Sequence, residues 1–152
     1  MIITVDSNVL LSVFIKDSLS QQSAALLEKY SPHEYIINDC IYLELAVHFG
    51  QLAKLNNALN TIDVRLIEEY ERNYEAIVKA WSQYLKKKKF VCPSCKKDIN
   101  PLCPHCHKRL TFRQRILTDF LIGGFALAHS NGIITLDPAY YKNYFPQLKF
   151  FE

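Results

Sequence analysis

The sequence predicts an α/β protein, in which a parallel sheet is sandwiched between helices and a short cysteine-rich segment is inserted into the domain. Short apolar runs, such as residues 2–5 and 133–136, alternate with longer segments that have helical periodicity. Two C-x-x-C pairs follow one another in the second half of the chain. The length of 152 residues suits one compact domain with a sizeable core.

The first strand is predicted at residues 2–5. Asp6, Ser7 and Asn8 follow it and supply capping side chains for a helix at 9–15. The next predicted elements are a helix from Ser18 or Ser20 to Tyr30, a strand at 34–38, a helix from 38 or 39 to about 49, a strand at 61–64 and a long helix at 66–85. Strands separated by helices in this way favour a parallel sheet.

Breaker residues and periodicity set the limits of these elements. Pro32 ends the second helix, and Gly50 is a C-terminal stop for the third. In the long helix, apolar residues such as Ile67, Tyr70 and Tyr74 recur at helical spacing. The remaining predicted elements are a helix at 116–130, a strand at 133–136 and an edge strand at 147–151.

Composition excludes several classes of protein. Apolar residues make up 49% of the chain and charged residues 22%, as in an ordinary globular protein. No apolar run approaches the roughly 18 residues needed to span a bilayer, and the first residues lack the basic region of a secretory signal. We therefore expect a cytoplasmic protein with no membrane partner.

Positive charge is concentrated in residues 86–115. This segment holds ten of the 18 basic residues and one acid, so its charge is +9, whereas the rest of the chain carries −6. Such a block is typical of a protein with a polyanionic partner, although a solvated, lysine-rich connection would look the same. The basic residues are Lys86, Lys87, Lys88, Lys89, Lys96, Lys97, Lys108, Arg109, Arg113 and Arg115.

The two C-x-x-C pairs predict a tetrahedral Zn²⁺ site with Cys92, Cys95, Cys103 and Cys106 as ligands. His105 or His107 is a less favoured substitute. Two disulfides and a redox pair are the alternatives, of which disulfides are disfavoured in a reducing compartment. We assign residues 86–111 to an inserted zinc-ribbon-like module, and 1–85 with 112–152 to the main domain. The module either stabilises a long loop, holds a basic segment over the neighbouring face, or does both.

Four carboxylates, Asp6, Glu44, Asp119 and Asp137, are candidate metal ligands. Each aspartate alone could be a helix cap, a helix-dipole partner or a turn residue. Glu44 is harder to explain, because it lies beside an apolar stripe of its helix. Together the four can converge at the carboxyl ends of parallel strands, where Mg²⁺ or Mn²⁺ would relieve their repulsion.

Three segments carry a resemblance to a known family: MIITVDSNVLL, NDCIYLELA and LTDFLIGGFALAHSNGIITLDPAYY. They resemble a PIN domain, in particular the VapC-type ribonuclease toxins and their relatives, over nearly the whole chain except about 86–111. The resemblance implies a PIN-like α/β/α sandwich and a Mg²⁺- or Mn²⁺-dependent endoribonuclease. Its acidic positions are matched by Asp6, Glu44, Asp119 and Asp137, and polar positions that orient water or ligands are matched by Asn8 and Thr135.

The sequence departs from the family pattern at three places. Gly123 and Gly124 replace part of an alanine-rich helix, which indicates close backbone packing there. Leu136 stands where a basic residue usually precedes the last aspartate. The cysteine module is inserted in the domain, whereas PIN nucleases of ribosomal-RNA maturation carry a zinc ribbon after it. That combination favours structured RNA as the target, with the ten basic residues as phosphate contacts.

The resemblance to toxins also implies an antitoxin protein that occupies or distorts the cleft, and a homodimer. Three alternatives to a toxin stay open. The protein could be an RNA-processing nuclease of the ribosomal-RNA maturation type, or a zinc-ribbon RNA- or protein-binding module on an inactive PIN scaffold. A phosphotransfer domain with Asp6 as nucleophile is disfavoured, because Asn8 stands where a second aspartate would be expected.

Overall fold

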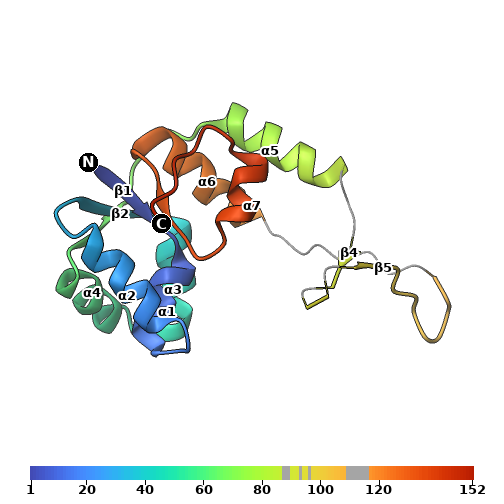
Figure 1. The fold of residues 1–152 in the computed structure, drawn as a ribbon, viewed down its shortest axis with the longest axis horizontal. Coiled ribbons are helices and arrows are strands. Elements are labelled where there is room, and N and C mark those ends of the chain that lie inside the picture. The colour runs from blue at the N-terminus through green and yellow to red at the C-terminus, as the bar shows by residue number, and fades with distance from the viewer. Residues whose placement is uncertain (87–89, 93, 96, 109–116) are drawn as a thin grey trace.

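A computed structural model describes residues 1–86, 90–92, 94–95, 97–108 and 117–152. Its centre is a four-stranded parallel sheet with the strand order β3-β2-β1-β6 (Figure 1). The strands are β1 (Ile2–Val5), β2 (Glu34–Asn38), β3 (Val64–Ile67) and β6 (Ile133–Ile134). The predicted α/β class is confirmed.

Strand β1 lies at the centre of the sheet and aligns the others. Thr4 is paired with Ile36 of β2 on one side and with Ile133 of β6 on the other. Ile3 and Val5 have no exposed surface, because helices cover both faces of an all-parallel sheet. This pairing brings the carboxyl ends of β1, β2 and β6 to one edge.

The helices form two layers. Four of them, α1 (Ser7–Ile15), α2 (Ser20–Lys29), α3 (Asp39–Phe49) and α4 (Leu52–Thr61), connect β1 to β2 and β2 to β3. The chain then returns across the sheet to β6 through α5 (Tyr74–Lys86) and α6 (Leu117–His129), and α7 (Pro138–Tyr144) follows. Because parallel crossovers are right-handed, the reversal of direction puts the second group on the opposite face. Figure 1 shows the two groups on opposite sides of the sheet.

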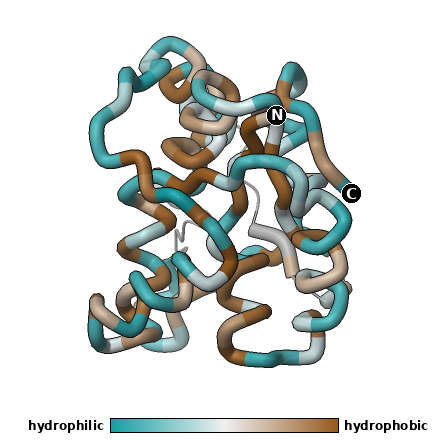
Figure 2. Tube along the Cα trace, turned by 90° about the vertical axis from the view of Figure 1, so that its left-hand side faces the viewer, coloured by the Kyte–Doolittle hydropathy of each residue, from teal (hydrophilic) through white to brown (hydrophobic). Residues whose placement is uncertain are grey.

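The predicted helix caps around α3 are present. Asn38 Oδ1 accepts a hydrogen bond from the Ile41 amide at 3.0 Å, and Gly50 ends the helix with a left-handed φ of 64°. The core side of α3 carries Ile41 and Leu45, both fully buried. In Figure 2, hydrophobic stretches run through the interior of the trace, whereas many peripheral turns are hydrophilic.

The prediction for residues 61–85 was wrong in its boundaries. Helix α4 was missed, β3 begins at Val64, and the long helix starts only at Tyr74. Periodicity suggested a helix from residue 66, but Leu66 and Ile67 pair with β2, and this long-range pairing overrides the local pattern. Asn73 sets the true start, since its Oδ1 accepts the Ala76 amide at 3.1 Å.

The C-terminal segment also differs from the prediction. The strand predicted at 133–136 ends at Ile134, because the Leu136 amide donates to Asn8 Oδ1 (3.1 Å) and not to a neighbouring strand. The edge strand predicted at 147–151 is reduced to one parallel bridge between Ile133 and Phe150. Helix α7 was not predicted.

The two helical glycines of α6 pack closely against neighbours, as predicted. A Cβ atom at Gly123 would overlap the ring of Phe145, and one at Gly124 would overlap the side chain of Ile77. Helix α6 therefore fits tightly against the C-terminal segment and against α5.

Two further strands, β4 (Phe90–Val91) and β5 (Asp98–Ile99), form an antiparallel pair that stands apart from the main sheet in Figure 1. They lie inside the segment predicted to be an inserted module, whose boundaries at 86 and 111 remain a prediction. In the described part of the chain, no helix is both long and apolar enough to cross a membrane.

Candidate active site

Asp6 occupies the junction between β1 and α1. Its backbone carbonyl accepts the amides of Val9 and Leu10, which starts the helix, but its carboxylate makes no capping hydrogen bond. The side chain is only 4% exposed. Capping, the simplest explanation for an aspartate here, therefore does not account for this carboxylate.

Two polar side chains hold the Asp6 carboxylate. Thr135, directly after β6, donates its hydroxyl to Asp6 Oδ2 at 2.7 Å, and Asn8 donates Nδ2 to the same oxygen at 2.9 Å. Asn8 Nδ2 also reaches Thr135 Oγ1 at 3.2 Å. The two residues that the resemblance matched to supporting polar positions thus contact one oxygen of Asp6, from opposite ends of the sequence.

Glu44 enters from α3. Its Oε2 accepts a hydrogen bond from the Ser7 hydroxyl at 2.5 Å, and the Glu44 side chain is partly buried. Ser7 is 8% exposed and was predicted only as a capping residue. Its contact with Glu44 had no sequence signal, because 37 positions separate the two residues.

Three acids form an electrostatic cluster. The pKa of Asp6 is raised from 3.8 to about 6. Burial is the largest cause, the negative charges of Glu44 and Asp119 add to it, and the Thr135 hydrogen bond lowers the pKa in part. Asp119 comes from the first turn of α6, where the helix dipole favours an acid. The fold therefore disfavours ionisation of Asp6 through burial and through the charges of two other acids.

Tyr141 on α7 is also affected by the charges of these acids. Its side chain is 2% exposed, and burial raises its pKa well above the usual value. Asp6, Asp119 and Glu44 all raise it further by charge repulsion. The same three carboxylates thus lie within electrostatic range of this phenol on α7, and they disfavour its ionisation.

Asp137, the fourth predicted acid, has a different environment. Its Oδ1 accepts the Tyr140 amide at 3.4 Å as the N-cap of α7, and its own amide donates to Thr135 Oγ1 at 3.1 Å. Its backbone amide is connected to Asp6 through the Thr135 hydroxyl, and its role as a metal ligand remains a prediction.

Among the described residues, no three His, Cys, Asp or Glu side chains lie close enough together to share one metal ion. The acids nevertheless supply the oxygen ligands that Mg²⁺ and Mn²⁺ prefer. A cation among Asp6, Glu44 and Asp119 would offset the repulsion that raises the pKa of Asp6. The donor chemistry therefore fits a divalent cation, although the side chains are not gathered into a coordination sphere.

The two cysteine pairs have matching backbone structure. The amide of Cys92 donates to the Lys97 carbonyl and the amide of Cys103 to the Lys108 carbonyl, each at 2.9 Å. The first cysteine of each pair thus closes a loop over the same number of residues. All five cysteines are free thiols, so the disulfide alternative is not present in this structure.

Within the second pair, the backbone amides of Cys106 and His105 lower the pKa of the Cys103 thiol. A stabilised thiolate is the form that binds metal. However, the four thiols are not brought together into one site in the described residues. The Zn²⁺ site predicted at Cys92, Cys95, Cys103 and Cys106 is therefore not assembled here.

Of the ten basic residues predicted to contact RNA, only Lys86, Lys97 and Lys108 belong to the described residues, and all three are exposed. The other seven lie outside the described residues: Lys87, Lys88, Lys89, Lys96, Arg109, Arg113 and Arg115. Their predicted contacts stay predictions.

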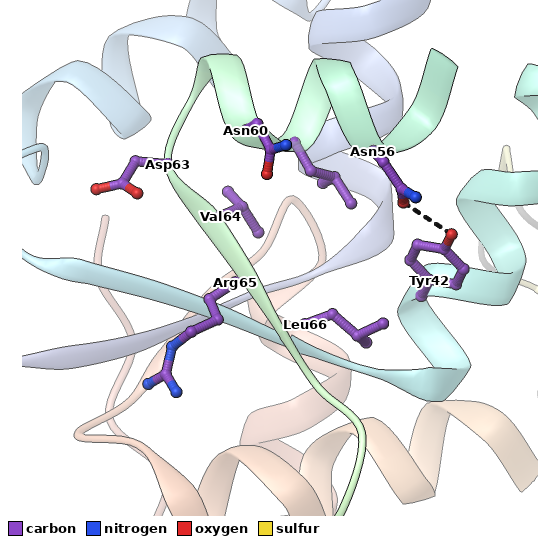
Figure 3. A pocket seen from close by; sticks show the side chains of 8 residues that line it. Tyr42, Asn56, Asn60, Asp63, Val64, Arg65 and Leu66 are labelled. Atoms are coloured by element: carbon purple, nitrogen blue, oxygen red, sulfur yellow. Dashed lines mark hydrogen bonds between the residues drawn. The ribbon is translucent and has the colours of Figure 1, made fainter. Parts of the chain in front are cut away.

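A pocket of about 490 Å³ opens elsewhere, between α4 and the outer strand β3. Figure 3 shows Asn56 and Asn60 of α4 facing Val64 and Leu66 of β3, and the Tyr42 hydroxyl bonded to Asn56 Oδ1 at 2.8 Å. None of the four candidate acids lines this pocket. This pocket is therefore separate from the candidate active site.

Comparisons with known proteins give a fold and no close relative. No protein-family model matches the sequence, and no curated protein matches it. A chain in the crystal structure of VapBC2 from Rickettsia felis bound to a DNA fragment from their promoter is similar with a TM-score of 0.64. The match covers 99% of this chain and 97% of that chain, at 13% sequence identity. The likeness is one of fold, and it confirms the predicted PIN-like α/β/α arrangement.

Proposed function

We propose that the protein is a Mg²⁺- or Mn²⁺-dependent endoribonuclease of the VapC type, which hydrolyses RNA phosphodiester bonds. The observation that carries this proposal is the buried Asp6 carboxylate, oriented by Thr135 and Asn8 and flanked by the charges of Glu44 and Asp119. The PIN-like fold and the family resemblance of the surrounding segments support the same activity.

The residues that would hold the cation are Asp6, Glu44 and Asp119, with Asp137 as a further predicted ligand. A bound Mg²⁺ or Mn²⁺ supplies an activated water and neutralises charge on the phosphate that is attacked. Thr135 and Asn8 fix the Asp6 oxygen that they share, and Ser7 fixes Glu44 Oε2. Burial of Asp6 keeps bulk water from screening these charges.

Cleavage of a short single-stranded RNA with Mg²⁺ or Mn²⁺ tests the activity directly. Asp6→Asn keeps the size of the side chain and removes its charge, so cleavage should fall by more than about 100-fold, since even the outer partners of metal ligands contribute about 10–100-fold. Asp63→Asn is the matched control, because Asp63 is exposed and remote from the acids. Equal cleavage by wild type and Asp6→Asn would refute the proposal, as would intact RNA in both ions.

For the cysteine segment we propose one structural Zn²⁺ bound by Cys92, Cys95, Cys103 and Cys106. The matching backbone hydrogen bonds of the two pairs and the free thiols support it. The ion would draw the two pairs together and stabilise the segment that carries the predicted RNA contacts. Elemental analysis of protein purified without chelators should give about one zinc per chain, a value set by four thiolates around a single ion.

We further propose that the nuclease is the toxin of a toxin–antitoxin pair, with an antitoxin covering the acidic site and two protomers pairing. The fold shared with a chain of the VapBC2 structure supports this assignment over ribosomal-RNA maturation. Expression of the wild-type chain should stop growth, and Asp6→Asn should not. A short reading frame directly upstream that restores growth would identify the antitoxin, whereas harmless expression of an active nuclease would favour RNA processing.

A further inference from the structure

A second polar cluster lies at the carboxyl edge of the sheet, outside the acidic site. Asp39 begins α3 directly after β2, and Tyr70 and Arg72 lie in the segment between β3 and α5. The Tyr70 hydroxyl donates to Asp39 Oδ1 at 2.6 Å, and Arg72 Nη2 donates to Asp39 Oδ2 at 3.3 Å. Both oxygens of Asp39 thus hold the segment that carries Arg72.

Arg72 is oriented but remains accessible. Its guanidinium lies over the Tyr70 ring, 5.3 Å from the centroid, and 40% of its side chain is exposed. Asp39 accepts from one guanidinium nitrogen, and the hydroxyls of Tyr74 and Tyr70 also interact with the guanidinium. An arginine has five N–H donors in a planar fork, so donors remain for a further ligand. A guanidinium fixed in this way can bind a phosphate through its remaining donors with little loss of side-chain entropy.

Strand register relates this cluster to the acids. Because Thr4 pairs with Ile36, Asp6 and Asn38 lie at the same level at the end of adjacent strands, and Asp39 follows Asn38. Burial and the charge of Asp39 raise the pKa of the Cys40 thiol most, Glu44 raises it further and Arg72 lowers it, so Glu44 and Arg72 both lie within electrostatic range of this thiol. Arg72 therefore stands at the rim of the acidic site, next to the helix that carries Glu44.

The acidic cluster by itself repels RNA. The charges that shift the pKa of Asp6 all come from carboxylates, and each phosphate of a single strand adds one more negative charge. A divalent cation would offset the charge at the phosphate that is cut, but the neighbouring phosphates along the strand need a separate cation. The guanidinium of Arg72, held at the rim of the acidic site, supplies such a positive charge.

We propose that Arg72 binds an RNA phosphate adjacent to the cleavage position and so positions the strand across the acidic site. This inference deepens the proposed ribonuclease function and rests on it. Asp39 and Tyr70 are positioning residues, since they act on the strand only through Arg72.

A purely structural role for Arg72, in which it only ties the β3–α5 segment to Asp39, predicts a different pattern. If the ion pair itself matters, Asp39→Asn should be as harmful as Arg72→Ala. If Arg72 binds phosphate, Asp39→Asn should weaken RNA binding less than Arg72→Gln does, because Arg72 keeps its charge and is only held less firmly.

The test measures binding of a labelled single-stranded RNA without added divalent ions, at several salt concentrations. Arg72→Gln keeps an amide donor for Asp39 and removes the charge, so the dissociation constant should rise on the order of tenfold. The slope of log affinity against log salt should fall by about 0.7, the value for one phosphate contact on a single strand. With Mn²⁺ present, KM should rise by a similar factor and kcat should change little.

Arg65→Gln is the matched control. Arg65 forms an ion pair with Glu34 at the amino end of β2, so it has the same chemistry at the opposite edge of the sheet. Binding by this variant should stay within about twofold of wild type, as expected for an exposed pair. Arg72→Lys, which keeps the charge without the fork, should lie between wild type and Arg72→Gln.

The inference is overturned if Arg72→Gln and Arg65→Gln bind RNA equally well, if Asp39→Asn weakens binding as much as Arg72→Gln, or if the wild-type protein binds no RNA. Its failure can be told apart from failure of the proposed function. Normal cleavage by Arg72→Gln would rule out only the proposed role of Arg72. RNA binding that depends on Arg72, without any cleavage, would rule out only the proposed nuclease activity.

Discussion

The protein contains two sets of candidate metal ligands, and they are built in opposite ways. Asp6, Glu44 and Asp119 come from three elements that are brought together by the parallel sheet and its helices, and Asp6 is almost fully buried. The cysteines come from two local loops, and Cys95 and Cys106 are exposed. Glu44 and Asp119 lie within electrostatic range of Asp6 before any ion binds, but among the described residues neither the acids nor the thiols are gathered into a coordination sphere.

This difference predicts where an ion matters for structure. In the acidic site the fold bears the cost of holding like charges together, and a cation would relieve it. In the cysteine segment the ion itself would create the structure, as in small zinc domains. Variants of the acidic site should therefore change activity and the pH dependence of stability, and variants of the cysteines should act locally.

After removal of the Asp6 charge itself, the largest effect on activity should come from the side chains that hold Asp6. Thr135→Val removes the hydroxyl that donates to Asp6 Oδ2 and accepts the Asp137 amide, so cleavage should fall about 10–100-fold. Thr135→Ser keeps the hydroxyl and should retain most of the activity. Full activity of Thr135→Val, measured by initial rates on the same RNA, would mean that this hydrogen bond does not orient the acid.

Removing the buried charge should stabilise the metal-free protein. Because the pKa of Asp6 is about 6 in the folded state and 3.8 in the unfolded state, folding stability is lost as pH rises from 3.8 to 6. At pH 8 the loss is at most about 3 kcal/mol, so Asp6→Asn should be more stable than wild type by about 1–3 kcal/mol. Below pH 4 this advantage should disappear.

Urea unfolding in EDTA at pH 8 and pH 4 measures this difference. Addition of Mn²⁺ at pH 8 should stabilise the wild type more than the variant, because the ion binds the charged form of Asp6. A variant that is no more stable than wild type at pH 8 would show that hydrogen bonding outweighs desolvation at Asp6.

Protons should compete with the cation at the acidic site. Below pH 6 the protonated Asp6 must lose its proton before it can bind, so Mn²⁺ affinity should fall by about fivefold from pH 6 to pH 5 and little between pH 7 and pH 8. Calorimetric titration of the wild type should show this bend. Asp6→Asn should bind more weakly and lack it, and an identical bend in both proteins would assign the titration to another group.

The smallest effect on the main domain should come from the cysteines. Replacing Cys92 and Cys95 by Ser should abolish bound zinc, but the unfolding temperature should change by no more than about 2 °C, since substitutions of exposed groups outside the core alter stability by only about 0.5 kcal/mol. A large drop would mean that the cysteine segment and the sheet unfold as one unit.

The sequence was most informative where long-range order follows from a simple rule. Asp6 ends an apolar strand, and the alternation of strands and helices was enough to predict its position at the carboxyl edge of a parallel sheet. Ile67 shows the limit: helical periodicity placed it in a helix, but pairing with Asn38 of β2 places it in a strand. Strand pairing depends on partners that are distant in sequence, so local patterns cannot detect it.

The site could be predicted in part for the same reason. Glu44 and Asp119, two of the predicted acids, act on Asp6 by charge, but their role as metal ligands stays a prediction. Asp137 caps α7, a helix that the sequence did not reveal. Ser7 and Tyr141 were missed as neighbours of the acids. A serine beside an aspartate and a tyrosine in an aromatic run have many roles, and only the packing of α3 and α7 selects this one.

The close contacts of Gly123 and Gly124 have a consequence for how the chain can vary. Phe145 and Ile77 fill the space that side chains on α6 would occupy, so the position of this helix is set by its neighbours on two sides. Asp119 lies one turn before Gly123 on the same helix, so the packing of the helix also fixes the position of Asp119. Segments of different length and sequence can therefore precede Leu117 in related proteins without displacing the acid, which makes this point of the chain suited to acquiring new modules.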